Sequence, residues 1–246
     1  MQKSIIKMKS FLLGCFLASS VTAFGQTMSN FNAVTLNYKM TPKFFLYAEG
    51  QLRSIKEFNY PDYYEIKGGI GYNINKNHKP LIGIGRYVTY KDKRSDKEEF
   101  RVWLQDVYDI KKGRVKFENR LRLEQSWFFE PKTEVHSTRN RLRYRLNVTV
   151  PINNSEVKKG TVFVNAYDEL FFARPASPSL ARNRVYGGVG YQVDKIFGIS
   201  GGYLWQREFD NKKGHTNVNF VYMNLNISID GTEHHAEREY HFPGAD

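Results

Sequence analysis

Hydrophobic and polar residues alternate with a period of two along most of this chain. In residues 114–129 the apolar side chains share one face, and the other face carries a charged row that includes Glu118, Arg120, Arg122 and Glu124. Residues 139–150 repeat the pattern with a second charged row, made of Arg139, Arg141, Arg143 and Arg145. In a helix these arginines would be spread around the axis, whereas a strand places them in one row. The pattern therefore predicts β-strands.

Alternation of the same kind predicts an all-β fold over the rest of the chain. It is clear in residues 43–53 and 64–74, and weaker in residues 80–91, 98–109, 161–172, 182–193, 197–208 and 215–229. No segment has 18 consecutive apolar residues, so no transmembrane helix is predicted. These ten segments predict one antiparallel barrel domain of about ten strands. Residues 30–39 are a further candidate, and because eleven is odd, twelve strands are the alternative.

Alternation alone does not tell the inside of a barrel from its outside. A soluble barrel turns its apolar face inward, and a membrane barrel turns it outward. The predicted strands are long compared with the usual five to six residues or so, and the charged rows mix Glu with Arg, as a self-neutralising lumen requires. We therefore expect a transmembrane β-barrel. A soluble periplasmic barrel that binds an apolar ligand is the alternative.

The lengths of the connections give the predicted barrel two different ends. Short connections are expected at 75–79, 111–113, 153–159 and 194–196, and longer polar ones at 54–62, 92–97, 130–137, 173–181 and 209–214. Outer-membrane barrels combine short periplasmic turns with longer outer loops. Aromatic residues near the long loops are expected to form an interfacial girdle: Tyr63, Tyr64, Tyr90, Trp103, Trp127, Phe128, Phe129, Phe171, Phe172, Tyr203 and Trp205.

The first 25 residues have the layout of a secretory signal peptide. A positive segment with Lys3, Lys7 and Lys9 precedes a short apolar stretch, and small residues end the segment at Gly25. We expect cleavage after Gly25, a barrel over residues 26–230 and a polar tail over residues 231–246. A lipoprotein signal at Cys15 is the alternative. Cys15 is the one cysteine of the chain, so no intramolecular disulfide and no cysteine-based zinc site is expected.

The net charge of the chain is strongly positive, and the predicted export of the protein limits which anionic partners this charge could bind. Lys and Arg number 37 and Asp and Glu 25, a net charge of +12, and aromatic residues make up 15% of the chain, too many for a disordered protein. For an exported protein we expect outer-membrane lipid and lipopolysaccharide as partners rather than nucleic acid. Basic residues of one predicted outer loop could meet lipopolysaccharide phosphates: Lys91, Lys93, Arg94 and Lys97. Barrel-insertion machinery is a further expected partner.

The two charged rows are the candidate functional residues. They would lie side by side on neighbouring strands and face the lumen, together with other inward charges such as Glu49, Glu65, Glu99 and Glu169. A barrel of ten to twelve strands lined by Arg and Glu should be largely filled by ion pairs, since unpaired charges in such a space are costly. A small pore that favours anions is the alternative, because the rows contain more Arg than Glu.

Enzymatic and metal-dependent functions have weak support in the sequence. His136 with Ser137 and His215 lie on predicted outer loops, where a lipid-modifying enzyme could keep its site, but no G-x-S-x-G motif is present. Glu233, His234 and His235 lie in the predicted tail, which is typical of a flexible polar segment as well as of a metal site. We expect no enzyme activity, no cofactor and no metal.

Several segments resemble one family of Gram-negative outer-membrane β-barrels whose members carry a "domain of unknown function" label. They are KFFLYAEGQLR, YYEIKGGIGYNI, FRVWLQDV, RVKFENRLRLEQSWF, RNRLRYRLNVTVP, NRVYGGVGYQV and GGYLWQRE. The resemblance runs from about residue 28 to residue 230, and its most specific part is the pair NRLRLEQ and RNRLRYRL. It implies an outer-membrane barrel and no agreed activity.

Overall fold

The computed structural model describes residues 28–54, 60–175, 179–210 and 214–232. Within these residues all eleven regular elements are strands: β1 Met28–Lys39, β2 Phe44–Ser54, β3 Tyr63–Tyr72, β4 Leu81–Lys91, β5 Arg94–Lys112, β6 Val115–Glu130, β7 Val135–Pro151, β8 Thr161–Arg174, β9 Leu180–Gln192, β10 Phe197–Glu208 and β11 Thr216–Asp230. The described part contains no helix long and apolar enough to cross a membrane. The predicted signal peptide and residues 233–246 of the predicted tail lie outside the described residues.

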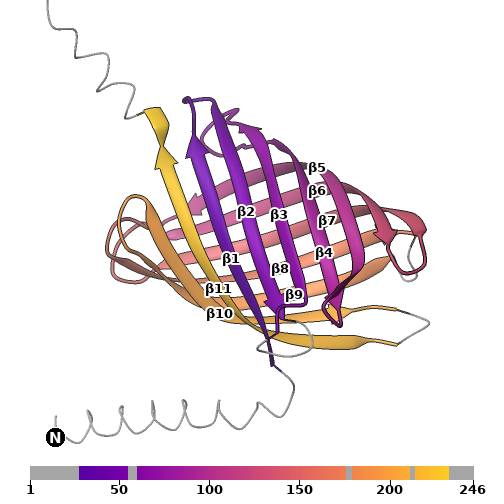
Figure 1. Cartoon of the computed structure of the whole chain (residues 1–246). Coiled ribbons are helices and arrows are strands. Elements are labelled where there is room, and N and C mark those ends of the chain that lie inside the picture. Colours follow the sequence, from indigo (N-terminus) through magenta and orange to yellow (C-terminus); the bar gives the residue numbers. More distant parts are fainter. Residues whose placement is uncertain (1–27, 55–59, 176–178, 211–213, 233–246) are drawn as a thin grey trace, which may run out of the picture.

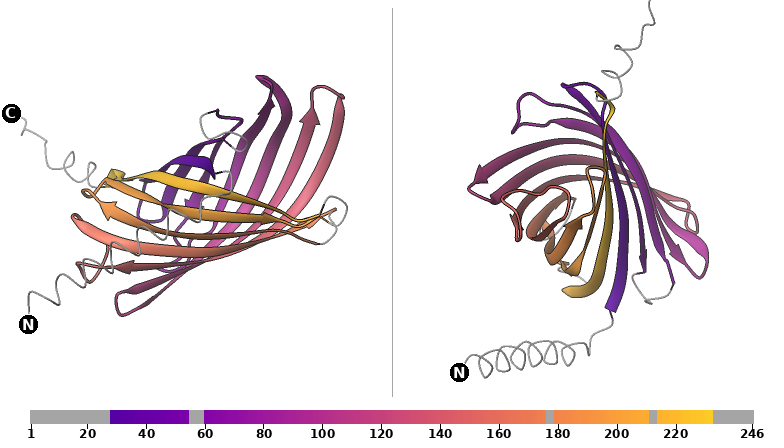
Figure 2. Two further views of the ribbon diagram at one scale, coloured as in Figure 1. Left: turned by 90° about the horizontal axis from the view of Figure 1, so that it is seen from below. Right: turned by 90° about the vertical axis from the view of Figure 1, so that its left-hand side faces the viewer.

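The eleven strands form one closed barrel. Each strand is antiparallel to the next in the chain, and the barrel closes where β1 lies beside β11 (Figure 1). Figure 2 shows the same sheet curling round from the other directions. In Figure 1, β1 begins at the bottom of the barrel and β11 ends at the top, so the start of β1 and the end of β11 lie at opposite ends of the barrel. We call these the N-terminal end and the C-terminal end of the barrel.

The predicted strand number, about ten with twelve as the alternative, is wrong, because the barrel has eleven strands. The prediction assumed that every neighbouring pair is antiparallel, including the pair that closes the barrel. The pair β1 and β11 is parallel over its whole length, from Met28 opposite Asn219 to Lys39 opposite Asp230. A parallel closing pair permits an odd number of strands, and residues 30–39 are therefore part of a full strand.

A ladder of polar side chains lines the inner face of this parallel seam. The hydroxyl of Thr35 donates to the amide oxygen of Asn224 at 3.2 Å, and the Asn37 amide donates to Asn226 at 3.3 Å. At the C-terminal end, the ammonium group of Lys39 lies 2.7 Å from the Asp230 carboxylate. Cross-strand pairs of this kind stabilise a sheet, and here they specify the register of the closing pair.

The predicted difference in loop length between the two ends is also wrong. The connections contain 8, 2, 4, 5 and 7 residues at the N-terminal end and 4, 8, 2, 9 and 4 at the C-terminal end. The predicted loop over 92–97 is a two-residue turn at Asp92 and Lys93, which both have positive φ, as type I′ hairpins require. The polar residues that follow belong to the start of β5, because a strand can be polar on both faces where it extends beyond the apolar part of the barrel.

Outward-facing apolar side chains cover the barrel, and charged side chains point inward. On the outer face Ile66 is 66% exposed and Leu123 is 55% exposed, whereas the neighbouring inward residue Arg122 is 2% exposed. Every strand from β1 to β11 contributes at least one exposed large apolar residue. The soluble alternative required the opposite arrangement, with the apolar face inside.

The predicted aromatic girdle is correct only in part. Trp127, Phe172 and Tyr203 lie on the outer face and are 45%, 37% and 45% exposed. In contrast, Trp103, Phe128 and Phe171 are buried inside the barrel. The difference arises because successive residues of a strand point to opposite faces, so a ring faces inward or outward according to its position along the strand.

Glycines inside the strands make room for aromatic rings of neighbouring strands. A Cβ atom on Gly71 would meet the ring of Phe45, and one on Gly190 would meet the ring of Phe163. Elsewhere two backbones approach each other, since a Cβ atom on Gly202 would lie 2.6 Å from the Cα atom of Gly188. Rings of β2 and β8 thus lie over glycines of the next strand near the C-terminal end of the barrel.

We predict that Gly202→Ala destabilises the barrel by about 1–3 kcal/mol, the usual cost of overpacking. The added methyl group would meet the backbone of β9 at Gly187 and Gly188, which cannot rotate away as a side chain can. The measurement is the free energy of unfolding in urea. Gly187→Ala is the matched control, because nothing lies within 4 Å of the Cβ position of Gly187. Equal stability of the two variants would contradict the prediction.

Candidate functional site

The structure places both charged rows on the inner face of the barrel. Strand β6 supplies Glu118, Arg120, Arg122 and Glu124, and strand β7 supplies Arg139, Arg141, Arg143 and Arg145. The strands pair so that Arg120 lies opposite Arg145 and Arg122 opposite Arg143, while Glu124 lies opposite Arg141. Like charges directly opposite each other destabilise a sheet. This wall of the lumen therefore depends on carboxylates that reach both rows.

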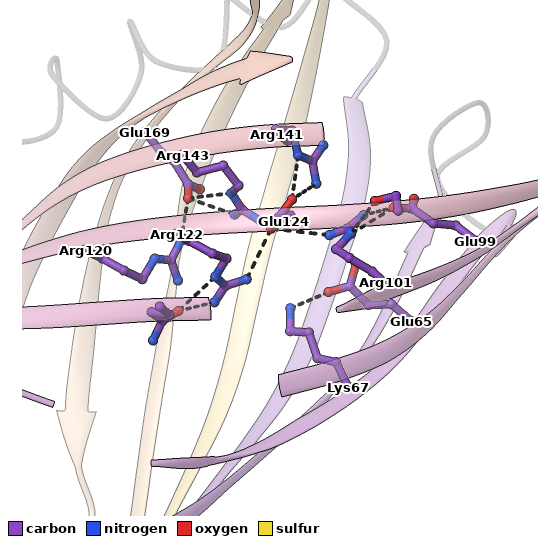
Figure 3. Close-up of polar contacts among 12 residues, drawn as sticks. Glu65, Lys67, Glu99, Arg101, Arg120, Arg122, Glu124, Arg141, Arg143 and Glu169 are labelled. Atoms are coloured by element: carbon purple, nitrogen blue, oxygen red, sulfur yellow. Dashed lines mark hydrogen bonds and ion pairs between the residues drawn. The ribbon is translucent and has the colours of Figure 1, made fainter. Parts of the chain in front are cut away.

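The carboxylate of Glu124 is the centre of the network (Figure 3). Its Oε2 lies 2.5 Å from Arg141, and its Oε1 lies 2.6 Å from Arg143. The guanidinium groups of Arg101 and Arg122 lie 3.6 Å from the same carboxylate. The Glu124 side chain is completely buried. One negative charge thus lies among four arginines from β5, β6 and β7, and each of them gives it a favourable contact.

Glu169, on β8, is the second shared carboxylate. It accepts a hydrogen bond from Arg143 at 2.8 Å and another from Arg120. Glu169 lies opposite Arg145 on β7 and opposite Arg184 on β9 in the sheet register. The Arg145 guanidinium pairs instead with Glu118 at 2.5 Å. Glu169 therefore links arginines of β6 and β7 from a third strand.

A second cluster of charges lies on β2 and β3. The ammonium group of Lys67 is 2.5 Å from Glu65 and 2.7 Å from Glu49, and Arg53 is 2.8 Å from Glu65. Glu99 on β5 lies 2.6 Å from Arg101 and so belongs to the Glu124 network. Figure 3 shows the second cluster beside the Glu124 network. Ion pairs thus join β2 with β3 in one group and β5 to β8 in another.

Aromatic rings lie between the arginines. The ring of Phe171, 1% exposed, has four guanidinium groups within 5.3 Å of its centre, those of Arg141, Arg143, Arg182 and Arg184. The Arg53 guanidinium lies 4.0 Å from the centre of the Phe31 ring. A cation above a ring is attracted by the π-electrons. These rings therefore add a second favourable contact to arginines that pair with carboxylates, and they also contact Arg184.

Sequence reasoning missed these rings as part of the site. It assigned Phe128 and Phe171 to an outer girdle because aromatic residues are common at membrane interfaces. Their phase gives the correct face, because Phe171 follows Glu169 by two residues and Phe128 follows Glu124 by four. An even spacing from an inward residue predicts an inward ring.

A cavity of about 330 Å³ lies between the charged side chains and the rings. Its lining comes from the middle and the N-terminal end of the barrel, including Phe31 and Arg53 near the start of β1 and the end of β2. Six of the eight predicted site residues line it: Arg120, Arg122, Arg139, Arg141, Arg143 and Arg145. The lumen is thus narrow but not completely filled.

The other candidate groups divide between this cavity and the rest of the barrel. Lys97, predicted to lie in an outer loop, instead lines the cavity, with its ammonium group 4.5 Å from the centre of the Phe128 ring. His136 stacks on Phe129 at 4.9 Å, and His215 lies 5.4 Å from Phe209. Within residues 28–54, 60–175, 179–210 and 214–232, no group of three or more His, Cys, Asp or Glu side chains could hold a metal ion.

The family model described as "Protein of unknown function (DUF2490)" matches residues 28–227 of the chain. The match covers every strand from β1 to β10 and most of β11. No curated protein matches the chain.

We predict that Glu124→Gln destabilises the barrel by about 3–5 kcal/mol, the cost of leaving buried charges without their partner. The substitution keeps the shape of the side chain but removes the one charge shared by four arginines. The measurement is the free energy of unfolding in urea. Glu98→Gln is the control, since Glu98 pairs with the exposed Arg86 and such pairs contribute at most about 1 kcal/mol. A loss no larger than that of the control would contradict the prediction.

Proposed function

The chain belongs to the DUF2490 family of proteins of unknown function, and we propose that it is an outer-membrane β-barrel whose lumen is closed by its own side chains. The proposed role is structural, and it requires no chemical step, cofactor or metal. The proposal includes export with a signal peptide cleaved after Gly25. It also includes insertion by barrel-insertion machinery and contact with outer-membrane lipid and lipopolysaccharide.

The distribution of apolar side chains carries the proposal. A membrane-spanning sheet must satisfy all its backbone polar groups and present apolar side chains to lipid. The barrel is closed by the pairing of β1 with β11, and its outer face is apolar on every strand. In water, an apolar surface of this extent would favour aggregation. Exposed cations beside one turn, at Lys91, Lys93 and Arg94, are available to lipid phosphates.

The ion pairs support a closed lumen. Arg143 reaches both Glu124 and Glu169, and ion pairs join β5 to β8 in one group and β2 with β3 in another. Towards the C-terminal end, aromatic rings lie over glycines of the neighbouring strand, as Phe45 does over Gly71. These contacts leave little room for a continuous water-filled path.

A small pore that favours anions is the second candidate function. The observation that favours it is the excess of arginine over glutamate around the lumen cavity. In such a pore the positive lining would raise the local concentration of anions.

We predict that the native protein shifts in mobility on SDS gels when it is heated. A closed transmembrane barrel keeps its hydrogen-bonded sheet in SDS until heat opens it. The measurement compares boiled and unboiled samples of the outer-membrane fraction. Recovery of the protein in the soluble periplasmic fraction, with no shift, would contradict membrane insertion.

We predict that the folded protein in planar bilayers shows no steady single-channel conductance, because ion pairs and rings close the lumen. Heat-denatured protein is the control for unspecific leaks. Steady channels would contradict the closed lumen and favour the pore instead. In that case the reversal potential in a salt gradient should indicate anion preference, and Arg184→Gln should reduce this preference while Arg86→Gln on the outer face should not.

A further inference from the structure

The lumen cavity has more cations than the carboxylates around it can neutralise. Twelve cationic side chains line it: Arg53, Lys67, Lys97, Arg101, Arg120, Arg122, Arg139, Arg141, Arg143, Arg145, Arg182 and Arg184. Eight carboxylates pair with them: Glu49, Glu65, Glu99, Glu118, Glu124, Glu130, Glu169 and Glu208. Four positive charges therefore remain uncompensated among the described residues.

Arg184, on β9, is the clearest of these uncompensated cations. Within the part of the chain that the structure describes, it makes no ion pair with a carboxylate, and its Nε donates to the neutral amide of Gln206 at 2.6 Å. Arg184 is only 7% exposed. Burying a charge without an opposite charge is costly, so an anion in the cavity would relieve the cost.

Other arginines of the cavity keep unused donors. In the described residues, the Nε atoms of Arg120, Arg139 and Arg145 are buried and have no hydrogen-bond partner. A guanidinium group recognises carboxylate, sulfonate and phosphate oxygens through such N–H groups, often two at a time. The cavity thus has both the charge and the free donors for an anionic group.

The aromatic residues that line the cavity indicate the chemistry of the uncharged part of the ligand. Seven aromatic side chains line the same cavity: Phe31, Tyr63, Phe128, Tyr167, Phe171, Phe220 and Tyr222. Guanidinium groups already lie over several of these rings, and an aromatic ligand could stack among them in the same way. The volume of about 330 Å³ is at the small end for ligand pockets. It suits one small molecule rather than a chain.

We propose that this cavity binds a small aromatic anion, namely a molecule that joins an aromatic ring to a carboxylate, sulfonate or phosphate group. The anionic group pairs with Arg184 and neighbouring arginines, and the ring lies against the aromatic lining. Because the cavity is inside the barrel, the proposal does not depend on whether the barrel spans a membrane or what its lumen conducts.

The test measures binding of naphthalenesulfonate to the folded barrel in non-ionic detergent by isothermal titration calorimetry. Two comparison compounds separate the two halves of the proposal: methanesulfonate has the charge without the ring, and naphthalenemethanol has the ring without the charge. We expect saturable binding of naphthalenesulfonate to one site, and binding of each comparison compound weaker by about tenfold or more, which corresponds to about 1.4 kcal/mol.

Arg184→Gln should weaken the binding of naphthalenesulfonate by about tenfold or more, and rising salt concentration should weaken binding to the unchanged protein. Arg184→Gln leaves no carboxylate without an ion-pair partner among the described residues, so the barrel should still fold, and the heat-dependent gel shift checks this. Arg86→Gln removes an equal charge from the outer face and should bind as the unchanged protein does.

Three outcomes would overturn the proposal. The first is the absence of saturable binding to the folded barrel. The second is equal binding by the Arg184→Gln and Arg86→Gln variants. The third is binding of naphthalenemethanol or methanesulfonate as tight as that of naphthalenesulfonate.

Discussion

Two buried carboxylates hold the interior of this barrel together. Strands β6 and β7 place arginines directly opposite each other, at Arg120 with Arg145 and at Arg122 with Arg143. The two arginines of each pair repel each other, and the strand register places no carboxylate between them. Glu124 and Glu169 offset this repulsion, because each carboxylate contacts arginines of more than one strand. Each carboxylate therefore contributes to the packing of a whole wall of the barrel rather than to one ion pair.

The aromatic rings of the lumen have a related electrostatic role. Carboxylates are fewer than cations around the cavity, and the ring of Phe171 lies 5.1 Å from the guanidinium group of the uncompensated Arg184. A ring attracts a guanidinium group and also separates it from the next one. Buried ion pairs contribute little net stability because of the cost of removing charges from water. The main effect of these ion pairs and rings is therefore structural: they keep the lumen narrow and leave a positively charged cavity.

The odd strand number has its own physical requirement. With eleven strands in a simple up-and-down order, the first and last run in the same direction, so the closing pair must be parallel. Parallel pairs are slightly less stable per residue than antiparallel ones. The ladder of Thr35 with Asn224 and Asn37 with Asn226 gives this seam side-chain hydrogen bonds on its inner face. The same parity places the start of β1 and the end of β11 at opposite ends of the barrel.

The sequence by itself determined the strands and their two faces, because a period of two is a local property that follows from the backbone of a strand. It located ten strands, named residues 30–39 as a further candidate, and placed the charged residues of each row on one face of its strand. Only the tertiary structure decided the strand number and the parallel seam. It also decided that Glu124 meets four arginines. These features depend on pairing between residues far apart in the chain, on the seam most of all, where β1 meets β11, and no local pattern specifies such pairing.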